Sequence, residues 1–371
     1  MSEATSMAFD LKRLKQYLSE VYGSEINLTF VGELGKESAA VEKLDNALKG
    51  FGYGKPYLIE FNVNGRKNSV VLETMRSNIF GHEFASDRAQ SLLMAHSLFS
   101  KLPRHAKSID VGVFMKDGNL MSVGNYAEFF ILTEKVEGKE YYKDLERIRD
   151  EKRLADIDIE RCQTLSDYLA EIHSVKKNSQ ELYRRRVREL LGHGECIMGL
   201  IDSYPSKLDF VTSKELESIE KKCISWRWKL KNRTNRLCQV HGDFHPWNVL
   251  FKDRSDLSVL DRSRGEWGEP ADDVAAMTIN YLFFSLQVYG SLEGPFKILY
   301  QKFLNDYIDK TGDQEILSVI QPYYVWRALV VASPIWYPNL SYDVRRKLFN
   351  FINNVLALDR LDLNKINSYL R

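Results

Sequence analysis

The sequence predicts an α+β protein of two lobes, with antiparallel sheet in the N-terminal lobe and mainly helices in the C-terminal lobe. The chain has 371 residues, more than the roughly 250 to 300 at which one hydrophobic core stops growing. Strand-like runs joined by Asn64-Gly65, the strongest short hairpin signal, mark the N-terminal part. Beyond them, apolar residues recur mostly at helical spacing. We therefore expect an N-terminal lobe over residues 1–136 and a C-terminal lobe over residues 137–371.

The N-terminal lobe is expected to combine helices with an antiparallel sheet. Apolar residues at helical spacing predict helices over residues 8–22 and 84–99. Runs rich in β-branched and aromatic residues predict the strands. The expected strands span residues 26–31, 56–63, 69–75, 110–115 and 129–133.

The C-terminal lobe shows core stripes on its expected helices. One stripe includes Leu165 and Leu169, and a second includes Ile219 and Trp226. Thr212-x-x-Glu215 would begin the second of these helices as a capping box. Three short strands are expected to interrupt the helices, at residues 237–240, 249–251 and 258–260.

Composition argues against several classes of protein. The formal charge is +1, from 52 basic and 51 acidic residues, so no global field attracts nucleic acid or an anionic membrane. The four cysteines lack metal-ligand spacing, which fits reduced thiols in the cytoplasm. No targeting segment and no apolar run of about 18 residues is found, so we expect no membrane partner. Oligomeric state stays open.

The most informative run of the chain spans residues 241–251 and continues to Asp261. Phosphoryl transfer needs a carboxylate that orients an acceptor hydroxyl and oxygen ligands that hold magnesium on nucleotide phosphates. Asp243 is the candidate base. Asn248 offers an amide oxygen and Asp261 a carboxylate, a hard oxygen pair suited to Mg²⁺. The spacing therefore predicts a phosphotransferase with Asp243 as catalytic residue and Asn248 and Asp261 as metal ligands.

These residues resemble a known family, the aminoglycoside phosphotransferases and choline kinases of the protein-kinase-like superfamily. Its catalytic loop has the form His-Gly-Asp-x-x-x-x-Asn, as residues 241–248 do, and its metal-binding Asp lies on a following strand. A later element, Gly-x-Pro-x-x-Asp-hydrophobic-Ala, is matched at residues 268–275. Leu165 to His173 resembles the helix that precedes the catalytic loop. The resemblance implies a bilobal protein-kinase-like fold that uses ATP and Mg²⁺.

The resemblance also implies a nucleotide site. Residues 133–138 look like the interlobe hinge that receives adenine, which makes Glu134 and Val136 candidate binding residues. The run at residues 50–54 looks like the loop that covers the phosphates. Its candidate binding residues are Gly50, Gly52, Gly54 and the adjacent Lys55.

The chain departs from the family at two places. Glu73 stands where the family has a phosphate-contacting Lys, and a carboxylate facing triphosphate is repulsive unless a cation such as Lys55, Lys67 or Arg76 compensates. Arg262 and Arg264 follow the metal-binding Asp, and guanidinium groups suit an anionic acceptor. The alternative is that one or both arginines pair with Glu266, Glu269 or Asp272.

Other interpretations of the motifs stay open at this point. His241-x-Asp243-x-His245 could hold a transition metal, although the resemblance gives both histidines structural roles. Asp273 is interpreted as a carboxylate that braces the loop. The basic run at residues 184–188 is interpreted as a solvated helix face, with a phosphate patch as the alternative.

The predicted function is an ATP- and Mg²⁺-dependent kinase of a small metabolite with a hydroxyl group, and the acceptor could be anionic. The acceptor itself cannot be read from loop motifs, because substrate choice depends on the shape of the pocket. The alternative is a pseudokinase, a nucleotide-binding regulatory module, motivated by Glu73 in the Lys position. A nucleotidyl transferase would keep the same fold, but no residue points to it specifically.

Overall fold

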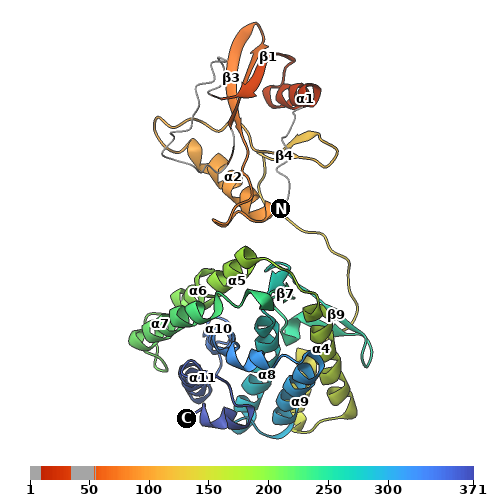
Figure 1. The fold of residues 1–371 in the computed structure, drawn as a ribbon, viewed down its shortest axis with the longest axis vertical. Helices are drawn as coiled ribbons and strands as arrows, with labels where there is room; N and C mark the ends of the chain where they lie inside the picture. The colour runs from red at the N-terminus through yellow and green to blue at the C-terminus, as the bar shows by residue number, and fades with distance from the viewer. Residues whose placement is uncertain (1–9, 35–53, 55) are drawn as a thin grey trace. The chain divides into compact units, whose positions relative to one another are not determined.

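The computed structural model describes residues 10–34, 54 and 56–371 (Figure 1). The chain forms two compact units, Met1–Thr133 and Glu134–Arg371, which are described separately below. The first unit carries antiparallel sheet and the second is mainly helical, which confirms the predicted α+β class. The predicted lobe boundary and the division between the units both fall in irregular backbone between residues 123 and 138.

The N-terminal unit is built on a three-stranded antiparallel sheet in the order β1-β2-β3. Helix α1 packs on β1 and β5, and a small apolar core fills the contact with Leu14, Leu18, Ile26, Ile59 and Phe61. The elements of this unit are α1 (Leu11–Tyr22), β1 (Ile26–Glu33), β2 (Pro56–Val63), β3 (Arg66–Glu73), α2 (Ala85–Phe99), β4 (Gly112–Phe114) and β5 (Leu120–Ser122).

The hairpin between β2 and β3 confirms the signal carried by Asn64-Gly65. The φ angles of Asn64 and Gly65 are 49° and 75°, so both residues occupy the left-handed region that a two-residue hairpin turn of type I′ requires. Close packing at the start of β2 explains a second glycine. A Cβ on Gly54 would lie 1.6 Å from the carbonyl oxygen of Thr74, so only glycine fits there.

The strand predicted over residues 129–133 is wrong. The structure has no regular secondary structure from residue 123 to residue 137. A strand needs a neighbour for its backbone N–H and C=O groups, and these residues pair with no strand among those that the structure describes. The apolar side chains of Phe130, Ile131 and Leu132 are largely exposed, which removes the other support for a strand.

The C-terminal unit packs nine helices around one core within residues 134–371 (Figure 1). Two short sheets, β6-β8-β9 and β7-β10, lie among them. The helices are α3 (Tyr142–Glu151), α4 (Asp156–Ser174), α5 (Gln180–Gly192), α6 (Ile197–Ser203), α7 (Ser213–Leu230), α8 (Pro270–Tyr289), α9 (Gly294–Thr311), α10 (Gln321–Ala332) and α11 (Tyr342–Val355). The strands are β6 (Lys139–Glu140), β7 (Cys238–Gln239), β8 (Val249–Phe251), β9 (Leu257–Val259) and β10 (Trp267–Gly268).

Helix α8 forms the centre of the C-terminal unit. Every residue from Pro270 to Leu286 is buried, because the helix packs against α3, α9 and α10 and is apolar on most of its circumference. Its N-cap is Glu269. The Glu269 carboxylate accepts a hydrogen bond from the backbone N–H of Ala271 and forms an ion pair with the buried Arg236. The first turn of α8 is thereby fixed in the core, and it carries the adjacent carboxylates Asp272 and Asp273.

Helix α7 begins as predicted. The Thr212 hydroxyl accepts a hydrogen bond from the backbone N–H of Glu215, the first half of a capping box. The Glu215 carboxylate binds Arg346 of α11 instead of turning back to the cap. None of the helices in the described part of the chain is both long and apolar enough to cross a membrane.

Candidate active site

The candidate catalytic loop, residues 241–248, connects β7 to β8 in the C-terminal unit. Gly242 adopts φ +86°, which a residue with a side chain rarely adopts, so the loop can turn sharply before Asp243. The backbone N–H of Leu260 donates to the carbonyl oxygen of Asn248, 2.9 Å away. Asp261, the next residue, therefore starts beside Asn248.

Asp273 braces this loop, as predicted. Its carboxylate accepts hydrogen bonds from the backbone N–H groups of His241 and Gly242, both at 2.7 Å. Nε2 of the buried His173 lies 3.1 Å from the same carboxylate, and Nδ1 of His173 lies 2.8 Å from the Tyr307 hydroxyl. Burial alone would raise the pKa of Asp273, but its hydrogen bond with His173 lowers that pKa below the usual value.

The two carboxylate oxygens of Asp243 have different surroundings. Oδ1 lies 2.5 Å from Nη1 of Arg327, within an ion pair. Oδ2 faces Nη2 of Arg264 and Nε2 of His245, each 3.7 Å away, which is too far for a hydrogen bond. No residue in the described part of the chain donates a hydrogen bond to Oδ2. Oδ1 is therefore bound by Arg327, whereas Oδ2 can still accept a hydrogen bond.

The charges around Asp243 keep it ionised. Burial would raise its pKa, but the charge of Arg327 and smaller contributions from His245 and Arg264 lower the pKa below the usual value. Burial in turn lowers the pKa of His245 to about 4. His245 is therefore neutral at pH 7, and the two arginines are the cations that lower the pKa of Asp243 at that pH.

The side chain of His245 is also oriented by the loop. Its Nδ1 accepts a hydrogen bond from the backbone N–H of Trp247 at 3.2 Å, which assigns the ring proton to Nε2. The Nε2–H group then points to the side of Asp243 that carries Oδ2. The sequence had predicted a structural role for this histidine, and the structure places it beside the candidate base as well.

Asn248 and Asp261 fit a magnesium site. The side-chain N–H of Asn248 donates to the carbonyl oxygen of Asp243 at 3.1 Å, which leaves the amide oxygen as a ligand. Asp261 is exposed, and its carboxylate makes no hydrogen bond or ion pair with the residues that the structure describes. Magnesium keeps several waters and phosphate oxygens, so one or two protein oxygens are the expected number of ligands.

The alternative of a transition-metal triplet at His241, Asp243 and His245 is not supported. No group of three or more His, Cys, Asp or Glu side chains in the described residues could hold a metal ion. Nδ1 of His241 instead accepts a hydrogen bond from the backbone N–H of Asp243, 3.3 Å away.

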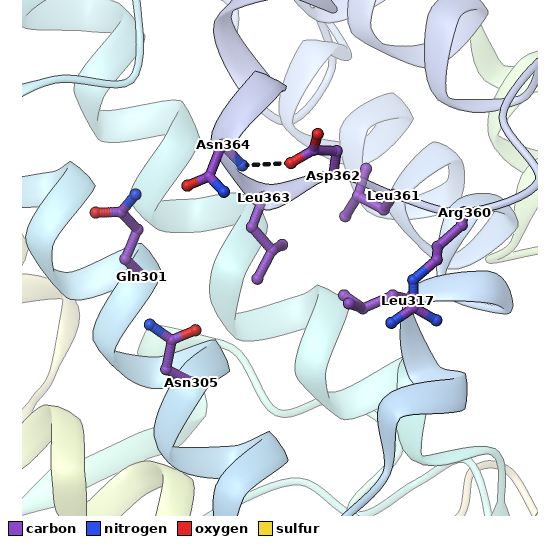
Figure 2. Close-up of a pocket in the computed structure, with 8 residues that line it drawn as sticks. All are labelled: Gln301, Asn305, Leu317, Arg360, Leu361, Asp362, Leu363 and Asn364. Carbon is purple, nitrogen blue, oxygen red and sulfur yellow. Dashed lines mark hydrogen bonds between the residues drawn. The ribbon is translucent and has the colours of Figure 1, made fainter.

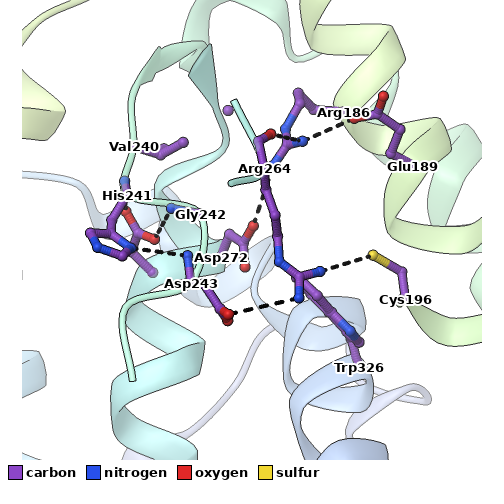
Figure 3. Close-up of polar contacts among 12 residues, drawn as sticks. Arg186, Glu189, Cys196, Val240, His241, Gly242, Asp243, Arg264, Asp272 and Trp326 are labelled. Atoms are coloured by element: carbon purple, nitrogen blue, oxygen red, sulfur yellow. Dashed lines mark hydrogen bonds and ion pairs between the residues drawn. The ribbon is translucent and has the colours of Figure 1, made fainter. Parts of the chain in front are cut away.

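The two arginines that follow Asp261 have different partners. Arg262 donates to the carbonyl oxygens of Val240 and Glu266, at 3.0 Å and 3.1 Å, so it binds backbone. Arg264 extends towards Asp243 and Cys196 beside the ring of Trp326 (Figure 3). Its Nη2 also lies 3.3 Å from the exposed carboxylate of Glu195. The sequence treated the two residues alike, and the structure places only Arg264 at the candidate base.

Two further arginines of the site were missed from the sequence. Arg327 of α10 contacts Asp243 across 84 positions of sequence, and no motif marks it. Arg186 of α5 donates to the carbonyl oxygen of Arg264 and lies 3.9 Å from Asp272 (Figure 3). Arg186 lies in the basic run that was interpreted as a solvated helix face, and for this residue the interpretation is wrong because its guanidinium is turned into the core.

Only some of the candidate nucleotide-binding residues of the N-terminal part belong to the residues that the structure describes. Gly50, Gly52 and Lys55 lie outside the described residues. Gly54 is described, at the start of β2 and against the backbone of Thr74. Glu73 ends β3 with an exposed side chain.

The expected hinge is irregular backbone before β6. The backbone groups of Glu134 and Val136 form no hydrogen bond with any residue that the structure describes. Of the cations proposed to compensate Glu73, Lys67 instead pairs with Glu60 at 3.0 Å.

A pocket lies in the C-terminal unit outside this site (Figure 2). Its volume is about 550 Å³. Gln301 and Asn305 of α9 line one side, and the chain around Asp362 lines the other. None of its lining residues belongs to the catalytic loop or to the arginines around Asp243.

Comparison with known families decides the classification. The model of the phosphotransferase enzyme family matches residues 117–291, which include the catalytic loop, Asp261 and the first turn of α8. This segment belongs to the phosphotransferase enzyme family. The resemblance seen in the catalytic loop is therefore confirmed at the level of the family. No curated protein matches the sequence of the whole chain.

Solved structures of phosphotransferases are also similar to this chain. A glucosamine kinase in complex with glucosamine, ADP and inorganic phosphate is 16% identical, with 58% of this chain and 59% of that chain covered and a TM-score of 0.39. An amicoumacin kinase is 13% identical, with 84% and 89% covered and a TM-score of 0.40. The choline kinase LicA from Streptococcus pneumoniae is 13% identical, with 94% and 98% covered and a TM-score of 0.34. The classification rests on the family match and not on these structures.

Proposed function

We propose that this phosphotransferase transfers the γ-phosphoryl group of ATP, with Mg²⁺, to a hydroxyl group of a small metabolite. The observation that carries the proposal is the asymmetry of Asp243, whose Oδ1 is bound by Arg327 while Oδ2 keeps its capacity to accept a hydrogen bond. Kinase-like enzymes use such a carboxylate to orient the acceptor hydroxyl. A carboxylate with no lone pair left to accept the hydroxyl could not do so.

The proposed step moves one phosphoryl group from ATP to the acceptor hydroxyl. The acceptor oxygen forms a bond to the γ-phosphorus, and the bond from that phosphorus to the leaving ADP oxygen breaks. Asp243 Oδ2 accepts the hydrogen bond of the acceptor hydroxyl and then its proton, which passes on to solvent or to the product phosphate. Asn248 and Asp261 would hold Mg²⁺, which neutralises charge on the phosphates when bound.

We assign the nucleotide-binding groups to residues 1–136 and the acceptor groups to residues 137–371. In the N-terminal part the candidates are Gly50, Gly52, Gly54 and Lys55, with Glu134 and Val136 for adenine. The irregular backbone before β6 supports the last two, because its N–H and C=O groups are unpaired within the described residues. Nucleotide binding is expected to survive changes at Asp243.

We further propose that the acceptor carries an anionic group that Arg264 binds. The guanidinium of Arg264 has five donors, and because its Nε is buried, a ligand could reach only the two Nη groups. Among the described residues, the ion-pair partners of its Nη2 are the exposed Glu195 and, at 3.7 Å, Asp243. A carboxylate or phosphate on the acceptor could bind these donors and bring its hydroxyl to Oδ2 of Asp243.

We place this reaction in the cytoplasm and expect a small-molecule partner, with no nucleic acid and no membrane. All four cysteines are free and buried, as in a protein from a reducing compartment. The balanced charge of the chain gives no global field that would attract nucleic acid.

The test of this function is Asp243→Asn. Asparagine keeps the size of the side chain but cannot take the hydroxyl proton, so turnover should fall by at least about 10²-fold while nucleotide binding persists. ATP consumption is measured against a panel of hydroxylated metabolites, and ATP binding by calorimetry. Asp309→Asn on the exposed face of α9 is the matched control and should be unchanged. Full turnover in Asp243→Asn would refute the role assigned to this residue.

A second candidate function is the nucleotide-binding pseudokinase. Glu73 favours it, because the side chain at the position of the family lysine is an exposed carboxylate with no ion-pair partner among the described residues. The two functions differ in turnover. ATP consumption that disappears in Asp261→Ala supports the kinase, whereas ATP binding without turnover, indifferent to Asp261→Ala, supports the pseudokinase.

A further inference from the structure

A single buried arginine connects the catalytic loop to the central helix of the C-terminal unit. Arg327 of α10 is 5% exposed. Its Nη1 lies 2.5 Å from Asp243 Oδ1, and its Nη2 lies 2.6 Å from Asp272 Oδ1 in the first turn of α8. Nη2 also donates to the carbonyl oxygen of Gly242, 3.1 Å away. One guanidinium therefore binds both the candidate base and the backbone next to it.

The direction of this guanidinium is set before any ligand binds. Helix α10 is buried along most of its length between α8 and α11. The Arg327 guanidinium lies 3.7 Å from the centroid of the neighbouring Trp326 ring, and Trp326 is fixed by a hydrogen bond of 2.9 Å to the carbonyl oxygen of Glu195. A planar guanidinium packed against an aromatic ring loses its freedom to rotate. It can present its two Nη groups in one direction only.

Stability alone is a poor explanation for this arrangement. Removing charges from water costs several kcal/mol per ion, on the order of what a buried ion pair returns, and apolar replacements are often neutral or stabilising. The Arg327 Nε is buried and has no hydrogen-bond partner in the described part of the chain. An unpaired buried donor costs free energy, so this group opposes stability. What the bridge does achieve is to bind Oδ1 of Asp243 and leave Oδ2 to face Arg264 and His245.

We propose that Arg327 is a positioning residue of the phosphoryl transfer, which fixes Asp243 by Oδ1 so that Oδ2 alone receives the acceptor hydroxyl. This inference rests on the proposed function. Without Arg327 the carboxylate could rotate about its terminal bond, and its two oxygens would share the contacts of the loop. Substrates would still bind, but fewer complexes would have the hydroxyl in line for transfer. The loss should therefore appear in kcat and not in KM.

The test compares Arg327→Met, Arg327→Lys and Arg327→Ala with Arg345→Met in the full chain. Arg345 of α11 is equally buried, at 4% exposed, but it binds the backbone carbonyl oxygens of Ala332, Tyr337 and Leu340. It controls for the loss of a buried arginine as such. ATP consumption gives kcat and KM for the accepted metabolite, and calorimetry gives the affinity for ATP with Mg²⁺.

We expect Arg327→Met to lower kcat by about 10²-fold, with KM and ATP affinity within about threefold of wild type. The kcat of Arg327→Lys should lie between those of wild type and Arg327→Met, because one ammonium cannot bind Asp243, Asp272 and Gly242 in the same geometry. Added guanidinium ion should restore kcat in Arg327→Ala. Arg345→Met should lower the melting temperature and leave kcat unchanged.

Several outcomes would overturn the inference. Unchanged kcat in a folded Arg327→Met protein would do so, as would an equal loss of kcat in Arg345→Met. If Arg327→Met does not fold, the lysine variant decides, because wild-type kcat in Arg327→Lys removes the need for a fixed guanidinium. Wild-type protein that turns over no metabolite is a different result, and it would refute the proposed function together with this inference.

Discussion

The carboxylates assigned to the proposed reaction differ between the two units of the molecule. In the C-terminal unit, Asp243, Asp272 and Asp273 are buried and bound by arginine, histidine or backbone N–H groups. In the N-terminal unit, Glu73 is exposed at the end of β3, and Glu60 binds the exposed Lys67 and the hydroxyl of Ser69. The acceptor half of the proposed site is thus organised in the protein alone, whereas exposed carboxylates contribute little to the geometry of the other half.

The difference shows how much of the reaction geometry is fixed without ligands. Buried polar groups must be paired, because an unpaired group in the core costs about 1 to 3 kcal/mol. This requirement holds the catalytic loop in one conformation. Exposed charges exchange partners with water at little cost, so Glu73 is free to respond to a nucleotide. Three substitutions can break or sharpen this comparison.

The largest effect is expected for Asp273→Asn, which alters a buried carboxylate of the C-terminal unit. The carboxylate accepts hydrogen bonds from the backbone of His241 and Gly242, and the new amide would direct an N–H group at one of these donors. We expect a loss of about 3 kcal/mol in the free energy of unfolding of the C-terminal unit. Urea unfolding followed by tryptophan fluorescence measures it, since all six tryptophans lie in this unit.

The same variant carries a pH signature. The pKa of Asp273 is lower in the folded protein than in the unfolded chain, so its stabilising contribution is present above the unfolded pKa of about 3.9 and is lost as pH falls through the folded value. The difference between wild type and Asp273→Asn should therefore shrink on acidification. Asp309→Asn on α9 should change stability by less than about 0.5 kcal/mol. A difference that does not depend on pH would contradict the assigned ionisation.

Local signals in the sequence predicted the elements well. Asn64-Gly65 predicted its hairpin because only a few residue types adopt two successive positive φ angles. The spacing of His241, Asp243 and Asn248 marked the candidate catalytic loop, because that loop is continuous in sequence. The bracing role of Asp273 followed from a motif as well. In the first two cases the signal and the structure lie within a few residues of each other, whereas Asp273 contacts His241 across 32 positions and was recognised only through the resemblance to the family.

Contacts between distant segments could not be predicted. Arg327 binds Asp243 from 84 positions away, and its own helix reads as an ordinary apolar stripe. The strand expected at residues 129–133 failed for a related reason, because a strand is defined by its partner and none of the described residues pairs with it. Arg262 and Arg264 look identical in sequence, and only the backbone turn between them sends one to carbonyl oxygens and the other to Asp243.

A smaller effect should separate these two arginines. We expect Arg264→Gln to raise the KM for an anionic acceptor by about 10- to 100-fold, which corresponds to the loss of one charge-assisted hydrogen bond. Arg262→Gln is the matched control, because its contacts are to the backbone of Val240 and Glu266, and KM should stay within about twofold. Steady-state kinetics with the accepted metabolite and with a neutral analogue measures both. An equal rise of KM for the neutral analogue would exclude anion recognition by Arg264.

The smallest effect is expected in the N-terminal unit, at the exposed Glu73. If its carboxylate faces the nucleotide, Glu73→Gln should tighten ATP binding by about two- to fivefold, because exposed charges interact with at most about 1 kcal/mol. Glu20→Gln removes an exposed charge from α1 of the same unit and should leave ATP affinity unchanged. Calorimetry at low and high salt measures both, and the gain should decrease with salt because mobile ions screen exposed charges. Weaker binding in Glu73→Gln would instead show that this carboxylate helps to hold the nucleotide, for example through a cation, and the contrast between the two units would then disappear.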